Sequence, residues 1–244
     1  MHLPRWAFQS PSNCLTRTVI TNHQAIGLSL NAPFKRRAAD IAYDRIETLI
    51  SKLVIEPGSP VVEADLAELT GLGRTPVRES LMRMVSIGLI VQQPRRGLMV
   101  SAINVADHLD VIQTRRALER LIAANAARRA TAEQRKTMLA CAQGMVEAAS
   151  RDNLDDYMEA DQALDHVVHS ACRNRSAVKA VVPLVVQCRR FWYAYQHEGD
   201  TVHAARAHQE MAEAIASGNE AEATRHAGLL MDYLEQFARR VIDT

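Results

Sequence analysis

The residues from 35 to 101 place apolar side chains at helical spacing in three short segments, and each segment is closed by a turn signal. The stripe of the first segment consists of Ile41, Ile46, Leu49, Ile50 and Leu53. Pro57-Gly58 ends that segment, and a second short helix is predicted over 62–70, ending at Gly71. The pattern predicts a compact helical unit with a turn between its helices.

The third segment begins with Thr75-Pro76, where we expect Thr75 to cap the helix and Pro76 to be its first residue. This helix is predicted to run to about Ile87 and to end at Gly88. Two short strands are predicted at 89–92 and 98–101, and the turn between them holds Arg95 and Arg96 at its tip.

Beyond Asn104 the pattern predicts only helices. Thr131 followed by Gln134 is typical of a capping box at the start of the second one. The six expected helices cover 105–129, 131–150, 154–172, 176–197, 202–217 and the stretch from about 220 onwards.

The fold class that follows is mainly α, with three parts. Residues 1–33 lack periodicity and contain three prolines, so we expect a flexible N-terminal extension. The alternative is that the translation start of this sequence lies upstream of the real one. Residues 34–103 have the layout of a winged helix-turn-helix domain. Residues 104–244 are expected to form an all-helical antiparallel bundle that binds an effector and dimerises.

Composition narrows the class of protein. The chain has 244 residues, of which 48% are hydrophobic and 23% charged, as in an ordinary globular protein. It has four scattered cysteines without CxxC spacing, no apolar run long enough for a membrane span, and no signal-peptide pattern. We therefore expect a cytoplasmic protein without a membrane partner.

Charge is divided unevenly along the chain, although the net charge is only +1. Residues 1–104 hold 12 basic and 8 acidic residues, whereas residues 105–244 hold 17 basic and 20 acidic ones. An excess of positive charge in the N-terminal part indicates a nucleic-acid-binding module there.

Arginines occupy the two places where a winged helix-turn-helix meets DNA. Arg74, Thr75 and Arg78 lie near the N-terminus of the third helix, where free N–H groups and the helix dipole favour a phosphate. Arginine also reads guanine in the major groove with two hydrogen bonds, and Arg95 and Arg96 in the wing can reach the backbone. The alternative is that these arginines only solvate the surface.

These segments resemble the N-terminal domain of GntR-family bacterial transcription regulators. The resemblance rests on residues 71–81 (Gly-Leu-Gly-Arg-Thr-Pro-Val-Arg-Glu-Ser-Leu), on 88–90 and on 94–97. The family pattern has Ser or Thr where this chain has Gly73. The operator-binding residues that the resemblance implies are Arg74, Thr75, Pro76, Arg78, Arg95, Arg96 and Gly97.

The bundle resembles the effector domain of the FadR subfamily, also called the FCD domain. Residues 115–119, 161–174 and 208–223 carry this resemblance, and six helices in about 140 residues are similar to the shorter, VanR-like branch. The resemblance implies a ligand-responsive regulator rather than an enzyme.

Many members of that subfamily hold a divalent metal with one Asp and three His side chains. Asp161 and His208 match this pattern, but Asp165 and Leu230 stand where the family has His. His226, one turn before Leu230, is a possible substitute. The resemblance therefore implies a site for zinc, nickel or manganese formed by Asp161, Asp165, His208 and His226, with Arg115 completing the effector site.

Two further interpretations of the bundle cluster remain open. Asp161 and Asp165 lie on one helix face, together with His169. One interpretation is an effector pocket without metal. The other is a buried polar network in which Asp161, Asp165 and His208 pair with Arg115 or Arg116. The segment 189–193 (Arg-Arg-Phe-Trp-Tyr) is either part of a pocket for an anionic ligand, or a dimer contact or core segment.

The function that these observations predict is a repressor. It is expected to bind a palindromic operator as a homodimer and to be released by a small organic acid in the bundle. One alternative is a regulator whose signal is the divalent cation itself. A more remote alternative is a metal-dependent hydrolase, but the chain shows no nucleophile–base arrangement and no phosphate-binding glycine loop.

Overall fold

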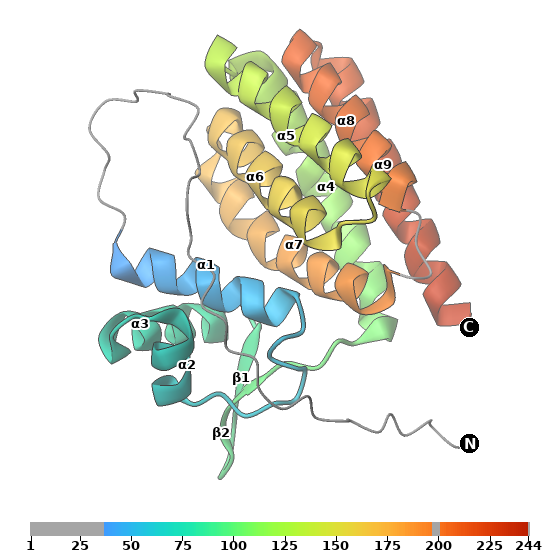
Figure 1. Ribbon diagram of the computed structural model, residues 1–244. Helices are drawn as coiled ribbons and strands as arrows, with labels where there is room; N and C mark the ends of the chain where they lie inside the picture. Colours follow the sequence, from blue (N-terminus) through green and yellow to red (C-terminus); the bar gives the residue numbers. More distant parts are fainter. Residues whose placement is uncertain (1–36, 197–200, 244) are drawn as a thin grey trace. The chain divides into compact units, whose positions relative to one another are not determined.

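The computed structural model describes residues 37–196 and 201–243, which belong to one compact unit, Arg37–Thr244 (Figure 1). The expected N-terminal extension, residues 1–33, lies outside the described residues.

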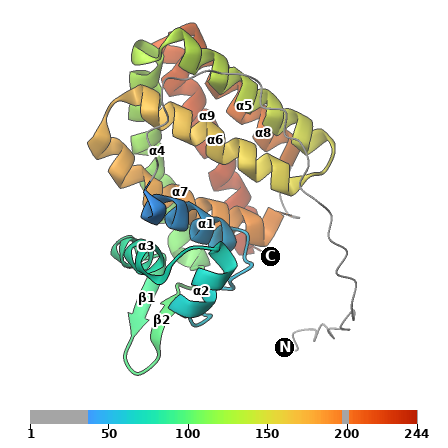
Figure 2. The same cartoon turned by 60° about the vertical axis from the view of Figure 1, so that its left-hand side comes forward.

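The first part of this unit has the order of elements that the sequence predicts. Its elements are α1 (Ala38–Ser51), α2 (Glu63–Thr70), α3 (Arg74–Ser86), β1 (Ile90–Gln93) and β2 (Gly97–Val100). The two strands pair antiparallel, from Ile90 opposite Val100 to Gln93 opposite Gly97, and form the hairpin seen in Figure 2. The strands differ from the predicted bounds by one residue at each end. The turn is correspondingly tighter, because Arg95 and Gly97 both adopt positive φ angles.

A small apolar core holds α1, α2, α3 and the hairpin together. Ile46 and Ile50 of α1 pack with Leu81 and Met84 of α3, and all four are at most 1% exposed. Their spacing is that of the helical stripe read from the sequence. Val186 of α7, from the second part of the chain, is buried in the same cluster.

The second part is a bundle of six helices in the described residues, as predicted. They are α4 (Val105–Arg129), α5 (Ala132–Ser150), α6 (Leu154–Cys172), α7 (Arg175–Tyr195), α8 (Thr201–Ser217) and α9 (Glu220–Asp243). The capping box is present, since Thr131 and Gln134 each accept a hydrogen bond from the other's backbone N–H. Helix α4 packs against α6, α7, α8 and α9, so it runs through the centre of the bundle (Figures 1 and 2).

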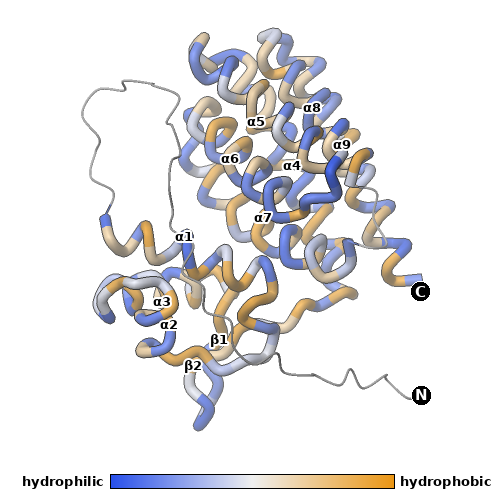
Figure 3. The backbone as a smooth tube through the Cα atoms, in the orientation of Figure 1, coloured by the Kyte–Doolittle hydropathy of each residue, from blue (hydrophilic) through white to orange (hydrophobic). Residues whose placement is uncertain are grey.

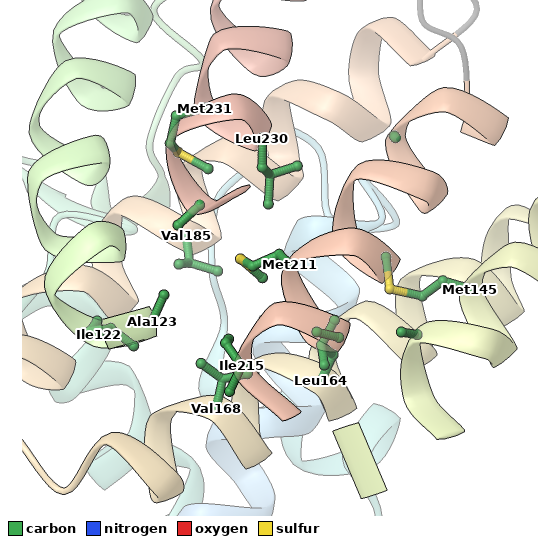
Figure 4. Packing of buried hydrophobic residues seen from close by; sticks show 14 of the residues in the cluster. Ile122, Ala123, Met145, Leu164, Val168, Val185, Met211, Ile215, Leu230 and Met231 are labelled. Atoms are coloured by element: carbon green, nitrogen blue, oxygen red, sulfur yellow. The ribbon is translucent and has the colours of Figure 1, made fainter. Parts of the chain in front are cut away.

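The bundle core is apolar and rich in alanine and methionine. Figure 4 shows Val185, Met211, Leu230 and Met231 meeting from three different helices. Each helix carries both hydrophilic and hydrophobic residues along its length (Figure 3). None of the helices in the described part of the chain is long and apolar enough to cross a membrane. The mainly α fold class is thus confirmed.

Candidate functional site

The start of α3 offers free backbone donors to the solvent. Gly73 is the N-cap, with φ −70° and ψ 161°, and none of the described side chains caps the helix. The helix therefore begins at Arg74, and the expectation that Thr75 caps it and Pro76 opens it is wrong by two residues. Pro76 is tolerated because the N–H groups of a first turn have no partner within the helix. Arg74 and Thr75 are exposed at this end and Pro76 is half-buried.

Arg78 is exposed on α3 but already has a partner. Its Nε and Nη2 donate to the two carboxylate oxygens of Glu63, at 2.9 and 2.7 Å, and Glu63 is the first residue of α2. The hydrogen bond from Arg78 holds the pKa of the Glu63 carboxyl below its usual range. Exposed ion pairs contribute little stability, so a phosphate or base can compete for Arg78. No local pattern in the sequence singles out Glu63 as this partner.

The wing presents two further arginines. Arg95 and Arg96 are exposed in the turn between β1 and β2, next to Gly97. Within residues 37–196 and 201–243, neither they nor Arg74 is paired with a carboxylate. The α3 N-terminus and the wing therefore expose three unpaired guanidinium groups and one weakly held one.

A second candidate site lies inside the bundle, around Arg189 of α7. Its Nε donates to Asp161 Oδ2 at 2.7 Å and its Nη2 to Asp165 Oδ2 at 2.5 Å, and both carboxylates come from one face of α6. Its Nη1 lies 3.5 Å from Glu47 Oε1 on α1. One buried guanidinium thus joins three carboxylates from two helices.

The electrostatics of these groups depend on Arg189. Burial raises the pKa of Glu47, and the charge of Arg189 opposes that rise. For Asp165 burial also acts to raise the pKa, but Arg189, with His169 and Arg115, holds it below its ordinary value. The nearby positive charge therefore wins at Asp165, whereas burial wins at Glu47, which is also farther from the guanidinium.

The partners predicted for these carboxylates are different in the structure. Arg115 is buried but donates to Glu119, one turn along α4, at 2.8 Å. Arg116 pairs instead with Asp232 and Glu235 of α9. A buried polar network, one of the interpretations left open by the sequence, is therefore present but built on Arg189 instead of Arg115 or Arg116. In the sequence, Arg189 stood out only as part of a basic and aromatic segment.

His208 joins this cluster from α8. Its Nδ1 lies 2.8 Å from the carbonyl oxygen of Ala204, so this nitrogen must carry the proton that is donated. Its Nε2 lies 3.4 Å from Asp161 Oδ1. The expected proximity of Asp161, Asp165 and His208 is therefore present, with a guanidinium among them.

His226 does not join the cluster. Its Nδ1 lies 3.4 Å from Glu210 and its Nε2 3.7 Å from Glu222, so it belongs to a pair of acids on α8 and α9. Leu230, at the other position where the family has His, is 2% exposed and packs beside Val185 and Met211 (Figure 4). The prediction that His226 acts as a substitute ligand is therefore wrong, because the side chain points to a different part of the bundle.

The residues present do not fit a divalent metal as arranged here. In the part of the chain that the structure describes, no group of three or more His, Cys, Asp or Glu side chains is placed to hold a metal ion. Asp161 and Asp165 each direct a carboxylate oxygen to Arg189, whose charge would repel a metal ion between them. The predicted set of four ligands is thus not assembled.

Two cavities border Arg189. One, of about 40 Å³, lies inside the bundle, and its polar lining consists of Arg115, Tyr157, Asp161, Arg189, Trp192 and His208. The indole Nε1 of Trp192 is buried and has no hydrogen-bond partner among the described residues. The other cavity, of about 100 Å³, lies between α1, α6 and α7, and includes Glu47, Asp165 and His169.

Comparison with known proteins identifies the class of molecule. Residues 38–100 match the family model "Bacterial regulatory proteins, gntR family", and residues 110–232 match the FCD domain. This chain belongs to the gntR family of bacterial regulators, in the form that carries an FCD domain. The resemblance read from the sequence is confirmed at that level.

Similar proteins support this assignment. An HTH-type transcriptional regulator of Agrobacterium vitis is 30% identical over 134 residues, which cover 54% of this chain and 78% of the relative. The HTH-type transcriptional repressor RspR of Escherichia coli is 32% identical over 108 residues, 44% of this chain and 47% of that one. Among solved structures, E. coli McbR/YncC has a TM-score of 0.73 at 14% identity, covering 85% of this chain and 99% of that one. That likeness concerns the fold alone.

Proposed function

We propose that this gntR-family regulator is a repressor that binds a palindromic operator as a homodimer and is released by a small organic acid. The observation that carries the DNA-binding part is the uncapped start of α3 beside an unpaired wing. Arg74 and Thr75 offer backbone N–H groups at the positive end of a helix, and Arg95 and Arg96 add charge in the wing.

In this proposal α3 lies in the major groove. Arg74 and Arg78 read base edges, and Thr75 and Pro76 bring the start of α3 close to the DNA backbone. Arg95, Arg96 and Gly97 of the wing contact the adjacent phosphates. A homodimer repeats this contact one helical turn away, which makes the operator palindromic.

The test uses DNA selected by the full-length protein from a genomic library. Replacing both Arg74 and Arg78 with Ala is expected to weaken specific binding by roughly 100-fold or more at about 0.15 M salt, in fluorescence anisotropy. Arg206→Ala is the matched control, because Arg206 is an exposed arginine of the bundle. A double variant that still distinguishes the selected sequence from random DNA contradicts the assignment of α3.

For the effector we propose the cavity beside Arg115, Asp161, Arg189 and His208. Its walls are mainly apolar, and Trp192 Nε1 and the two arginines are the donors that a carboxylate requires. Each arginine is already paired, so an organic acid has to exchange with a carboxylate of the protein. Such an exchange changes the contacts among α1, α6 and α7, and by linkage it changes the affinity for DNA.

A thermal-shift screen of organic acids tests this. An acid present at 100 times its dissociation constant stabilises the folded protein by about 2.7 kcal/mol. Trp192→Phe keeps the aromatic volume and removes the indole donor, so it is expected to reduce the shift. An acid that stabilises the protein equally in the variant binds elsewhere.

A further inference from the structure

The guanidinium of Arg189 is surrounded in the way a bound cation is. Its three nitrogens face three carboxylates, at 2.7 Å for Asp161, 2.5 Å for Asp165 and 3.5 Å for Glu47, and its side chain is only 10% exposed. Carboxylates so deeply buried require a positive charge among them. Here the positive charge comes from the chain itself.

We propose that Arg189 is the resident cation of the effector site. Its guanidinium takes the position among Asp161, Asp165 and His208 in which a divalent metal would otherwise bind, and it links that position to Glu47 on α1 of the DNA-binding part. The inference deepens the proposed function in that it rests on this cluster being the effector site.

The donors around Arg189 are of the kind that a metal requires. His208 donates its Nδ1 proton to the Ala204 carbonyl, which leaves Nε2 directed towards Asp161. A backbone carbonyl that fixes the outer nitrogen in this way is the usual support of a metal-binding histidine. Two carboxylates and an imidazole suit zinc, nickel or manganese.

A second imidazole nitrogen lies next to this group. His169 follows Asp165 by one turn of α6, and its Nε2 is buried without a hydrogen-bond partner among the described residues. The charge of His169 also contributes to the lowered pKa of Asp165. The chain therefore retains the donors, and the guanidinium explains why they do not converge on a metal.

The position of Arg189 between two cavities accounts for the link to α1. The smaller cavity lies on the bundle side and the larger one on the side of Glu47. The contact with Glu47 is the longest of the three ion pairs. A ligand that competes for the guanidinium from the bundle side therefore loosens the contact with α1 first.

The experiment measures metal content of the full-length, untagged protein. Wild type, Arg189→Met, Arg189→Met with Asp161→Asn, and Arg190→Met are dialysed with Ni²⁺ and then against metal-free buffer, and bound nickel is counted by mass spectrometry. Arg190→Met is the matched control, since it removes a neighbouring buried arginine that has no carboxylate partner in the described residues. We expect about one ion per chain in Arg189→Met and none above background in the other three proteins.

Two results overturn the proposal. One is a nickel ion in wild-type protein that a fifth protein, Asp161→Asn with Arg189 kept, no longer binds, because the position then accepts a metal with Arg189 in place. The other is an Arg189→Met variant that folds and gains no nickel. Should this variant fail to fold alone, it is refolded with Ni²⁺, and recovery of helical circular dichroism supports the proposal whereas no recovery contradicts it.

The link to α1 is tested by hydrogen–deuterium exchange of residues 38–51. Exchange is expected to be several-fold faster in Glu47→Gln and in Arg189→Met, while the nickel content of Glu47→Gln stays at the wild-type level. Unchanged exchange in both variants contradicts the link. None of these measurements uses DNA or an organic acid, so their failure is distinguishable from failure of the operator or effector proposals.

Discussion

The two parts of this protein use arginine in opposite ways. Arginine supplies 25 of the 29 Lys and Arg residues of the chain. In the winged part, Arg74, Arg95 and Arg96 are exposed and have no acid partner among the described residues. In the bundle, Arg115 and Arg189 are less than 10% exposed and contact carboxylates at 2.5 to 2.8 Å.

The difference shows what each arrangement can do. An exposed guanidinium keeps its hydration and is free to exchange water for a phosphate or a base. A buried guanidinium has lost that hydration, so its partners hold it in one geometry, and removing a partner leaves a bare charge. The first arrangement suits a surface that binds and releases DNA, and the second suits a switch whose pairing changes with a ligand.

The largest expected effect comes from removing the cation of the bundle. Arg189→Met leaves three buried carboxylates without their shared partner, and we expect the free energy of unfolding to fall by about 3–5 kcal/mol at neutral pH. Urea denaturation measures this, with Arg206→Met as the exposed control. Without Arg189 the buried carboxylates have raised pKa values in the folded state, so the folded form of the variant binds more protons than its unfolded form. The loss in the free energy of unfolding is therefore smaller at acidic pH than at neutral pH. A loss of less than about 1 kcal/mol, typical of surface pairs, would show that the buried and exposed arginines do not differ as described.

The sequence predicts the features of this protein that arise from local interactions, but not those that arise from contacts between distant residues. Helical periodicity and caps are local, and for this reason all six bundle helices and the capping box at Thr131 were predicted. The pairing of Arg189 with Glu47 joins residues 142 positions apart, and no local pattern specifies it. The start of α3 was misplaced because Gly73, rather than the better capping residue Thr75, has the extended backbone of an N-cap.

His108 tests how the bundle treats a buried base that forms no ion pair with a carboxylate in the described residues. It stacks on Phe191 with ring centroids 3.7 Å apart, and burial, together with the charge of Arg115, lowers its pKa to about 4. Between pH 4 and 6.5 the unfolded chain binds more protons at this residue, so stability is full above that range and falls with decreasing pH. We expect this residue to account for a loss of about 2 kcal/mol between pH 7 and pH 5.

His108→Phe keeps the stacking and removes the titration. The free energy of unfolding of this variant is expected to depend less on pH than that of the wild type, and the difference between the two curves isolates the contribution of His108. Parallel curves for the two proteins would mean that the imidazole accepts a proton in the folded state as readily as in the unfolded chain.

Arg190 is the internal control for Arg189, because the two are adjacent on α7. Arg190 is 2% exposed and donates to the hydroxyl and carbonyl oxygens of Ser101, at 3.0 and 2.5 Å, but no carboxylate pairs with it in the described residues. Burial accordingly lowers the pKa of Arg190 to about 10. Arg190→Met loses two hydrogen bonds but also removes a desolvated charge, so we expect a cost of only about 1 kcal/mol. A cost equal to that of Arg189→Met in the same urea series would show that burial alone, and not pairing with carboxylates, sets the difference.

The smallest effect is expected at the exposed ion pair between Arg78 and Glu63. Glu63→Gln removes the charge that holds Arg78 and lowers repulsion towards the phosphates, while the amide can still accept a hydrogen bond. We expect affinity for the selected DNA to rise by up to about five-fold, and the effect to shrink as salt is added. Glu68→Gln is the matched control, since it makes the same change of charge at an exposed position of α2 that has no ion pair with Arg78 in the described residues. An equal rise in both variants means that net charge alone is responsible, whereas a fall in Glu63→Gln means that the carboxylate orients Arg78 for DNA, as the buried carboxylates orient Arg189.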